Sequence, residues 1–209
     1  MRRFRTASFT LALGMLAACF LTVVAETPEA ASGSSARSAK CDSLGSKTVI
    51  RTRAVRIFRK NGKTYGCHLD RGRAYALGDH PDLVDVGLYH FRAAGPVVAY
   101  ELLKQDRQEL TSNVLARDLR TGRRLRRAFQ GAAQVTDLEL RPTGSTAYIV
   151  ELPFASPSQY EVRIAPRALP LFESTLLDSG ADVDPRSLVL RGTTLYWTRG
   201  GVRRSVTLR

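Results

Sequence analysis

The chain has 209 residues, three cysteines and a formal net charge of +13 at pH 7, from 32 Lys and Arg against 19 Asp and Glu. Its hydrophobic fraction of 44% and charged fraction of 24% exclude a chain that is disordered throughout and a bundle of membrane helices. Three cysteines exclude a cysteine-dense scaffold. The length suits one hydrophobic core or a small array of repeats.

Residues 1–25 have the layout of a secretory signal peptide. Three arginines among the first five residues precede an uncharged, largely apolar segment that ends in Val-Val-Ala before Glu26. A lipoprotein signal is one alternative, because Leu-Ala-Ala-Cys at 16–19 resembles a bacterial lipoprotein box with Cys19 as the lipidated residue. An uncleaved membrane anchor is another, since the segment is long enough to span a bilayer. Each interpretation makes the protein secreted or extracytoplasmic.

The mature chain begins with a segment that cannot form a core. Residues 26–40 (ETPEAASGSSARSAK) combine Ala, Ser, Gly, Pro and charge without an apolar period, which predicts a flexible tether before a folded domain at 41–209. Two cysteines remain after the leader, Cys41 and Cys67. In an oxidising compartment an even pair predicts one disulfide, with two free thiols or a redox pair as the alternative.

From Cys41 onward the chain is a series of short strands. Val55 and Ile57 alternate with polar residues at period two, and Asn61-Gly62 between two such runs is a strong hairpin signal. Residues 98–110 have some helical character, but Val97, Val98 and Tyr100 favour a strand. Further turn signals lie at 70–72, 94–96, 121–122, 142–144, 191–192 and 200–201.

The strands repeat with a period of 48–50 residues. Tyr100, Tyr148 and Tyr196 are each 48 residues apart, and an apolar residue followed by Arg precedes each of them. The period predicts about four units, at 47–78, 84–128, 135–177 and 187–207, which stack to cover each other's apolar faces. The last unit is one strand short. Val49-Ile50 could supply that strand and close a ring, and an open stack of units is the alternative.

One hairpin also resembles a known kind of repeat. Asp118-Leu-Arg-Thr-Gly-Arg123 is similar to the D-x-x-T-G hairpin of bacterial β-propeller proteins of the TolB, WD40-like and quinoprotein-like kinds, over about residues 47–207. The resemblance implies an all-β fold: a propeller-like array of about four small antiparallel sheets, either closed or left open and incomplete. A two-sheet β-sandwich is the alternative. Quinoprotein chemistry is not implied, because a quinone site needs tryptophan stacking and the chain has one Trp.

No pattern of chemistry-bearing residues predicts an enzyme. The three histidines belong to no motif, and the sequence has neither a Gly-x-Ser-x-Gly elbow nor a phosphate-binding glycine loop. Trp197, beside Tyr196, is interpreted as packing rather than as a sugar-stacking platform. One local cluster has metal-ligand residue types, but its spacing fits neither an EF-hand nor a zinc site, so we expect a polar loop, no metal and no cofactor. That cluster consists of Asp79, His80, Asp82 and Asp85.

The basic run at 117–127 (RDLRTGRRLRR) is the main candidate for binding. On a strand, Arg124 and Arg126 share one side, and Arg123 and Arg127 share the other. These four arginines are predicted to bind an anionic polymer, such as wall phosphate, acidic polysaccharide or lipid headgroups. The alternative is an edge strand that its charges protect from aggregation. No aromatic residues are interleaved, which argues against specific nucleic-acid binding.

The expected function is therefore an exported, non-enzymatic binding or scaffold module of the bacterial cell envelope. It contacts a protein or an anionic polymer through its arginine-rich face, and it contacts membrane only through an uncleaved or lipidated N-terminus. The alternative is an extracellular hydrolase that acts on a wall glycan or another extracellular glycan.

Overall fold

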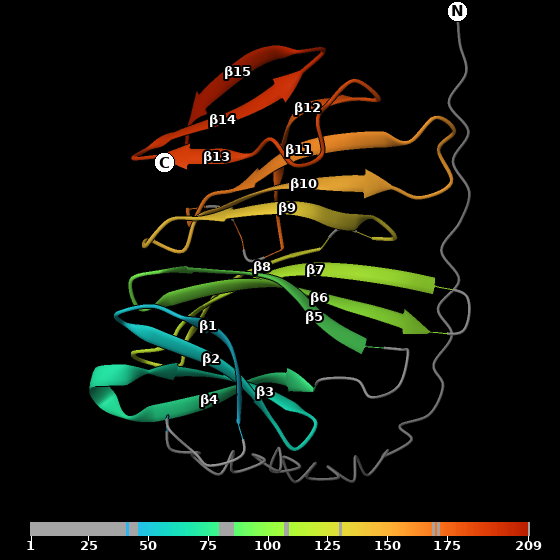
Figure 1. The fold of residues 1–209 in the computed structure, drawn as a ribbon. Coiled ribbons are helices and arrows are strands. Elements are labelled where there is room, and N and C mark those ends of the chain that lie inside the picture. The colour runs from blue at the N-terminus through green and yellow to red at the C-terminus, as the bar shows by residue number, and fades with distance from the viewer. Residues whose placement is uncertain are drawn as a thin grey trace, which may run out of the picture. The chain divides into compact units, whose positions relative to one another are not determined.

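The computed structural model describes residues 41, 46–79, 86–106, 109–129, 131–168, 170 and 172–208, which belong to one compact unit of the chain (Figure 1). The described residues form fifteen β-strands and one 3-10 helix, with no α-helix among them, which confirms the all-β prediction. The leader at 1–25, Cys19, the tether at 26–40 and the loop with His80, Asp82 and Asp85 lie outside the described residues.

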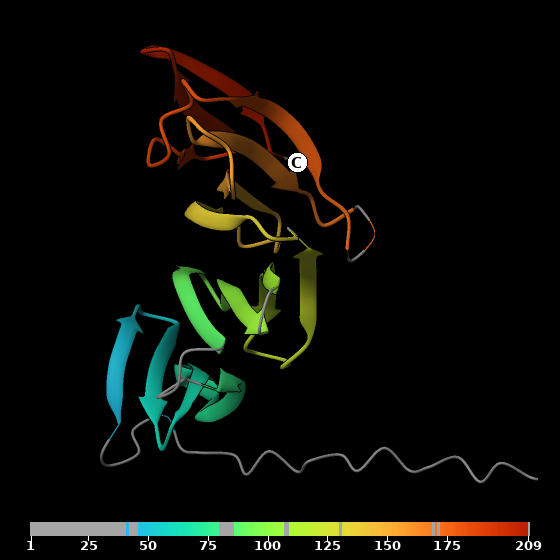
Figure 2. The ribbon, with the colours of Figure 1, turned by 90° about the vertical axis from the view of Figure 1, so that its right-hand side faces the viewer.

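The strands form four antiparallel sheets, and in each sheet they follow one another in sequence order (Figures 1 and 2). The first sheet contains β1 (Lys47–Arg51), β2 (Val55–Lys60), β3 (Lys63–His68) and β4 (Arg73–Asp79), with the 3-10 turn η1 (Leu69–Arg71) before β4. The second contains β5 (Val86–Ala94), β6 (Val97–Asp106), β7 (Glu109–Asp118) and β8 (Arg124–Phe129). The third contains β9 (Gln134–Leu140), β10 (Thr146–Leu152), β11 (Gln159–Ala165) and β12 (Thr175–Gly180). The fourth contains β13 (Val189–Arg191), β14 (Thr194–Arg199) and β15 (Val202–Thr207).

The four sheets coincide closely with the four predicted units, so the two-sheet sandwich does not describe this fold. Tyr100, Tyr148 and Tyr196 each lie on the second strand of their sheet. The predicted ring closure is wrong, because β1 pairs with β2 through Ile50 and Ile57 and the fourth sheet has three strands among the described residues. A short turn joins β1 to β2, so this local pairing needs far less loop-closure entropy than a pairing across the whole domain.

Turn chemistry explains where the hairpins bend. Asn61 and Gly62, between β2 and β3, have φ angles of 50° and 67°, the left-handed conformations that a two-residue type I′ turn requires. In the turn after β7, the amide of Gly122 donates to the carbonyl of Asp118 at 2.8 Å, and the amide of Arg120 donates to the Asp118 carboxylate at 2.8 Å. The Asp and Gly of the D-x-x-T-G hairpin therefore have direct structural roles.

Three apolar clusters join neighbouring sheets. Ile57 and Leu88 lie in the cluster between the first and second sheets, and Val135 lies in the cluster between the second and third. Trp197, which is 5% exposed, packs between the third and fourth sheets, and its indole nitrogen donates to Asp178 at 2.9 Å. Each fully buried aliphatic side chain contributes about 1.5–3 kcal/mol, so the inter-sheet clusters are the main source of stability.

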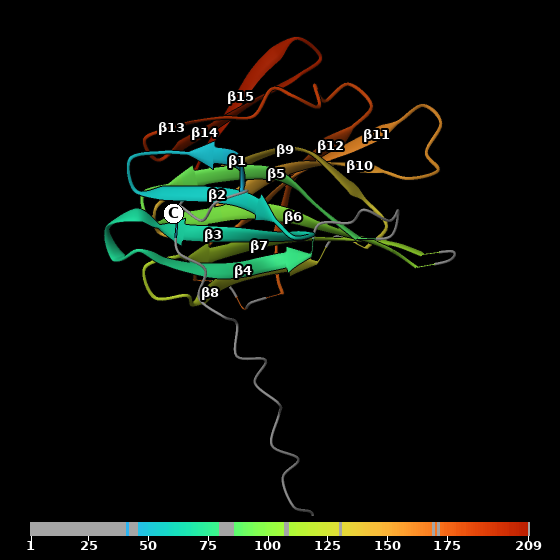
Figure 3. The ribbon, with the colours of Figure 1, turned by 60° about the horizontal axis from the view of Figure 1, so that its bottom comes forward.

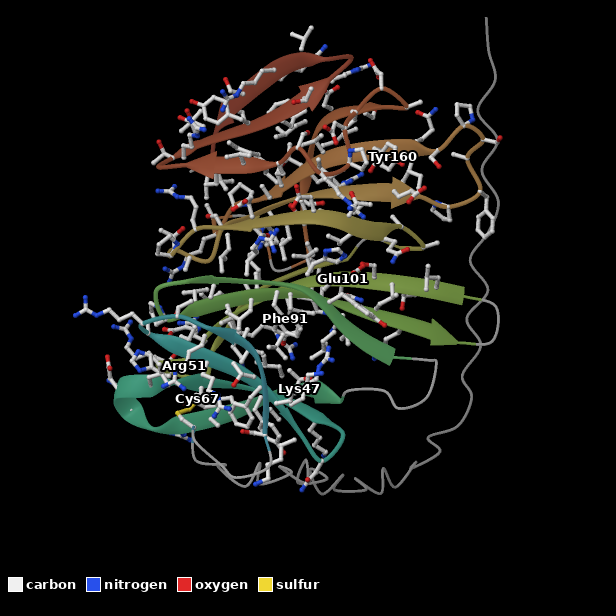
Figure 4. All side chains as sticks on the ribbon, in the orientation of Figure 1. Lys47, Arg51, Cys67, Phe91, Glu101 and Tyr160 are labelled. Carbon is white, nitrogen blue, oxygen red and sulfur yellow. A yellow bond between two sulfur atoms is a disulfide. The ribbon has the colours of Figure 1, made fainter. Side chains whose placement is uncertain are left out.

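A fourth cluster covers the other face of the first sheet. Phe58, Cys67 and Ala74 pack there with Cys41, and the predicted disulfide between Cys41 and Cys67 is present (Figure 4 labels Cys67). The disulfide attaches the start of the described chain to β3. It therefore holds Cys41 against an apolar face that no neighbouring sheet of the described residues covers.

Candidate functional site

Strand direction brings one set of hairpin turns to the same end of every sheet. The turns that join the first strand to the second and the third to the fourth lie at the end seen on the left in Figures 1 and 3. Contacts between sheets connect these turns. The Tyr75 ring packs against Gly122, the Leu125 side chain packs against Gly144, and the Arg141 guanidinium donates to the Leu208 carbonyl. The turns therefore form one continuous surface rather than separate loops.

Exposed arginines gather at this end, and every sheet contributes at least one. They are Arg51, Arg53, Arg71, Arg73, Arg120, Arg123, Arg124, Arg167 and Arg191. We call this surface the arginine end, and Figure 4 labels Arg51 on it. The acids at the described part of this end are Asp70, Asp118 and Glu173, and Asp118 is already paired with Arg120 at 3.7 Å. The surface is therefore strongly positive.

The turn that carries Arg123 and Arg124 is held in place by its own hydrogen bonds. The amide of Arg123 donates to the Thr121 hydroxyl at 3.2 Å. Arg117, at the base of this turn, donates to the carbonyls of Gly122 at 2.8 Å and of Ala76 in the first sheet at 2.6 Å. Both predicted binding residues in this turn are exposed, and a fixed backbone presents them.

The other two predicted binding residues have structural contacts. Arg126 is 0% exposed, and its guanidinium donates to the carbonyls of Pro170 at 2.6 Å and of Glu173. Arg127 donates to the Asn113 side chain at 3.1 Å and lies 5.7 Å from the centre of the Phe172 ring.

Arg126 therefore does not lie on an exposed binding face, contrary to the expectation from the basic run. Its side chain instead holds the loop between β11 and β12 against β8, and burial lowers its pKa below the ordinary arginine value. The alternation of arginines in the basic run could not reveal this contact. It is compatible with an exposed edge strand, and it carries no information about a loop of the next sheet that covers β8.

A second feature is a polar pocket of about 290 Å³ that the sequence analysis did not find. It is lined by His90 of the second sheet, residues of the third sheet and the loop before β13: Gln134, Val135, Thr136, Glu151, Tyr160, Pro185 and Arg186. His90 lies at a bulge in β5, where the pairing with β6 shifts between Tyr89 and Arg92, and its φ of 50° is left-handed. A bulge on β5 carries no distinctive sequence signal.

A buried carboxylate lies behind His90. Glu101 is 0% exposed, and its Oε1 accepts hydrogen bonds from the Ser112 hydroxyl at 2.7 Å and the Val135 amide at 3.0 Å. Its Oε2 lies 3.8 Å from His90 Nε2. Burial raises the pKa of Glu101, and the two hydrogen bonds only partly oppose this shift. Burial, and then the charge of Arg92, lower the pKa of His90, so its imidazole is neutral at pH 7.

Comparisons with family models, with curated proteins and with solved structures find no match for this chain. Within the described ranges, no group of three or more His, Cys, Asp or Glu side chains is arranged to hold a metal ion. The same residues include no helix of the length and apolarity needed to cross a membrane.

Proposed function

We propose that this protein is an exported, non-enzymatic binding module whose arginine end contacts an anionic polymer of the bacterial cell envelope. In this proposal the four sheets are the blades of an open, propeller-like array of the kind that the D-x-x-T-G hairpin resembles. The observation that carries the proposal is that exposed arginines on hairpin turns from all four sheets share one end.

The chemistry of arginine suits such a ligand. Each guanidinium offers a planar fork of donors that matches phosphate and carboxylate oxygens, and neighbouring guanidinium groups add their fields over a Debye length of about 8 Å at physiological salt. Because hydrogen-bonded turns such as 118–123 already hold the backbone, little backbone entropy is lost on binding, and the main ordering cost is that of the arginine side chains. A repeating polyanion could engage several arginines at once, which a single small anion could not.

The Cys41–Cys67 disulfide supports the export part of the proposal. Structural disulfides persist in oxidising compartments and are rare in the cytosol. The positive charge and the disulfide together fit a protein that meets anionic wall or surface polymers outside the cytoplasm.

Co-sedimentation with envelope material from the source cell, at salt concentrations from about 50 to about 500 mM, tests the proposal. Binding should fall steeply with salt. The double variant Arg123→Ala/Arg124→Ala should weaken binding and reduce the slope of log affinity against log salt by about two, one unit for each lost contact.

The matched control is Lys104→Ala/Arg203→Ala, which removes the same charge from exposed residues outside the arginine end. The control should retain most of the binding. Equal weakening in both double variants would show that net charge alone drives adsorption. Binding that does not respond to salt would contradict the role of the arginine end.

A hydrolase of wall or extracellular glycan is the second candidate function. The observation that favours it is the pocket at His90, because a neutral histidine next to a buried carboxylate is a common arrangement for a general base. Turnover of labelled envelope glycan that is lost in a His90 variant and retained in the Arg123→Ala/Arg124→Ala variant would favour this function over the first.

A further inference from the structure

The His90 pocket has features of a built ligand site rather than a gap between sheets. Its walls come from β5, β9, β10, β11 and the loop before β13, so residues far apart in the sequence meet only in the folded domain. It lies where the second, third and fourth sheets approach each other, and Figure 4 labels Glu101 behind it and Tyr160 in its wall. Concave sites between units of structure are the usual places for small ligands.

The backbone of His90 is strained in this site. A φ of 50° is unusual for a residue with a Cβ, and glycine would adopt it without strain. The bulge in β5 turns the chain so that the imidazole lines the pocket. Strained non-glycine residues of this kind concentrate at functional sites. The retention of histidine where glycine would be unstrained therefore indicates a role for the imidazole itself.

Glu101 provides a second and independent observation. Its Oε2 is fully buried and accepts no hydrogen bond from the residues that the structure describes, and His90 Nε2 at 3.8 Å is the polar atom paired with it. A buried carboxylate is unfavourable unless its oxygens are satisfied. Oε2 faces Nε2, so Glu101 lies directly behind the edge of the imidazole that points away from solvent. Glu101 is thus a positioning residue for His90.

The lining indicates a neutral ligand that carries many hydroxyl groups. Glu151 and Arg186 have opposite charges, so neither an anion nor a cation is favoured over a neutral molecule. Gln134 and His90 add groups that donate and accept, as sugar hydroxyls also do. Tyr160 adds an aromatic ring. The volume of about 290 Å³ is at the small end for ligand pockets and suits a single sugar ring.

A neighbouring hollow extends the site. It has a volume of about 200 Å³ and shares Gln134 and Glu151 with the first pocket. Phe154 lies at its rim with its side chain 100% exposed and a left-handed φ of 64°. A fully exposed phenylalanine at this position offers a flat apolar surface for the C–H face of a sugar ring.

We propose that this paired hollow is a binding site for a neutral glycan, with one sugar ring against His90 and the next ring over Phe154. The site is separate from the arginine end, so it does not rest on the anionic-polymer proposal. It deepens the second candidate function, which places a glycan in the same pocket, but binding without turnover would leave the site standing and remove the hydrolase. Glu151 and Gln134 lie between the two positions and can bond to both rings.

The test follows the Cε1–H signal of His90 by NMR in the disulfide-bonded chain. The probes are neutral trisaccharides (maltotriose, cellotriose and chitotriose), each at about 20 mM, enough to saturate a site with a Kd of about 1 mM. At least one probe should shift the His90 signal saturably. Because His90→Gly lacks this signal, isothermal titration calorimetry compares it with the wild type, and the variant should lose binding. Glycine suits the left-handed backbone, so circular dichroism should show that the variant is folded.

Matched variants separate this site from other surfaces. Phe154→Ala should weaken trisaccharide binding at least fivefold. Phe172→Ala, which removes an exposed aromatic residue from the β11–β12 loop, should leave trisaccharide binding unchanged. Arg123→Ala/Arg124→Ala should bind the trisaccharide normally, so failure of the anionic-polymer proposal would not affect this result.

Three outcomes would overturn the inference. The first is that no trisaccharide shifts the His90 signal. The second is that the sugar still binds to a folded His90→Gly variant. The third is that inorganic phosphate shifts the His90 signal at a lower concentration than any trisaccharide. The last outcome would make the pocket an anion site.

Discussion

Asp137 on β9 links three of the four sheets through one carboxylate. Its Oδ1 accepts hydrogen bonds from the Leu138 amide at 2.9 Å and from Arg92 of the second sheet at 3.3 Å. Its Oδ2 accepts a hydrogen bond from the amide of Leu188, just before the fourth sheet, at 3.0 Å. The substitution Asp137→Ala would remove all three bonds, so it tests whether polar contacts as well as apolar packing hold the sheets together.

The structure allows the loss to be estimated. Leu188 is 3% exposed, so its amide would be left buried without an acceptor, at a cost of about 1–3 kcal/mol. The lost bond to the Leu138 amide adds about 1 kcal/mol. The Arg92 side chain is 42% exposed, so the ion pair adds less than about 1 kcal/mol. We therefore expect Asp137→Ala to lower the free energy of unfolding by about 3 kcal/mol.

Urea unfolding at pH 7 provides the assay, with two probes. Far-UV circular dichroism reports on all the strands, and fluorescence of Trp197, the one tryptophan, reports on the packing of the fourth sheet. In the variant the fluorescence transition should occur at lower urea than the circular dichroism transition, because the connection to the fourth sheet is weakened most. Arg92→Ala is the control and should cost less than about 1 kcal/mol. Coincident transitions together with a loss below about 0.5 kcal/mol for Asp137→Ala would refute this role of Asp137.

Three further predictions concern stability. Reduction of the Cys41–Cys67 disulfide should lower the free energy of unfolding by about 3.5 kcal/mol, which follows from chain entropy for a sequence separation of 26. Urea unfolding measures this loss, and a loss of less than about 1 kcal/mol would contradict the prediction. Because burial raises the pKa of Glu101 in the folded state, its favourable contribution is complete below the unfolded value of 4.5 and is lost as pH rises through the folded value. Glu101→Gln retains an oxygen acceptor and removes the charge. In urea titrations its stability relative to the wild type should therefore rise as pH increases from about 4 through the folded pKa of Glu101, whereas a constant difference would argue against a raised pKa. Gly66→Ala places a Cβ 2.9 Å from both Cδ atoms of the fully buried Leu119, so calorimetry should show a loss of about 1–3 kcal/mol, and unchanged stability would mean that the two sheets can separate there without cost.

The strands and their grouping could be predicted because local features carry them. Alternation at period two, the Asn61-Gly62 turn and the spacing of Tyr100, Tyr148 and Tyr196 depend on residues close together in the chain or on repeated local patterns. The disulfide could be predicted because only two cysteines follow the expected leader. The pairing partner of β1 could not be predicted. Its residue pattern is compatible with the first sheet and with the fourth, and the choice between them depends on loop-closure entropy.

The candidate sites depend on contacts between residues far apart in the sequence. The basic run showed where charge is concentrated, but only the packing of the β11–β12 loop on β8 decided that Arg126 is buried while Arg123 is exposed. His90 and Glu101 belong to no motif, and their pairing arises from a bulge in one strand opposite its neighbour.

The amino-acid sequence by itself thus determined the strands, the turns and the number of units, because backbone conformation and side-chain alternation are properties of neighbouring residues. The tertiary structure alone decided which arginines face solvent and which polar groups share a pocket. These outcomes depend on how one sheet packs against the next, and burial between sheets is a property of pairs of distant segments that no single segment encodes.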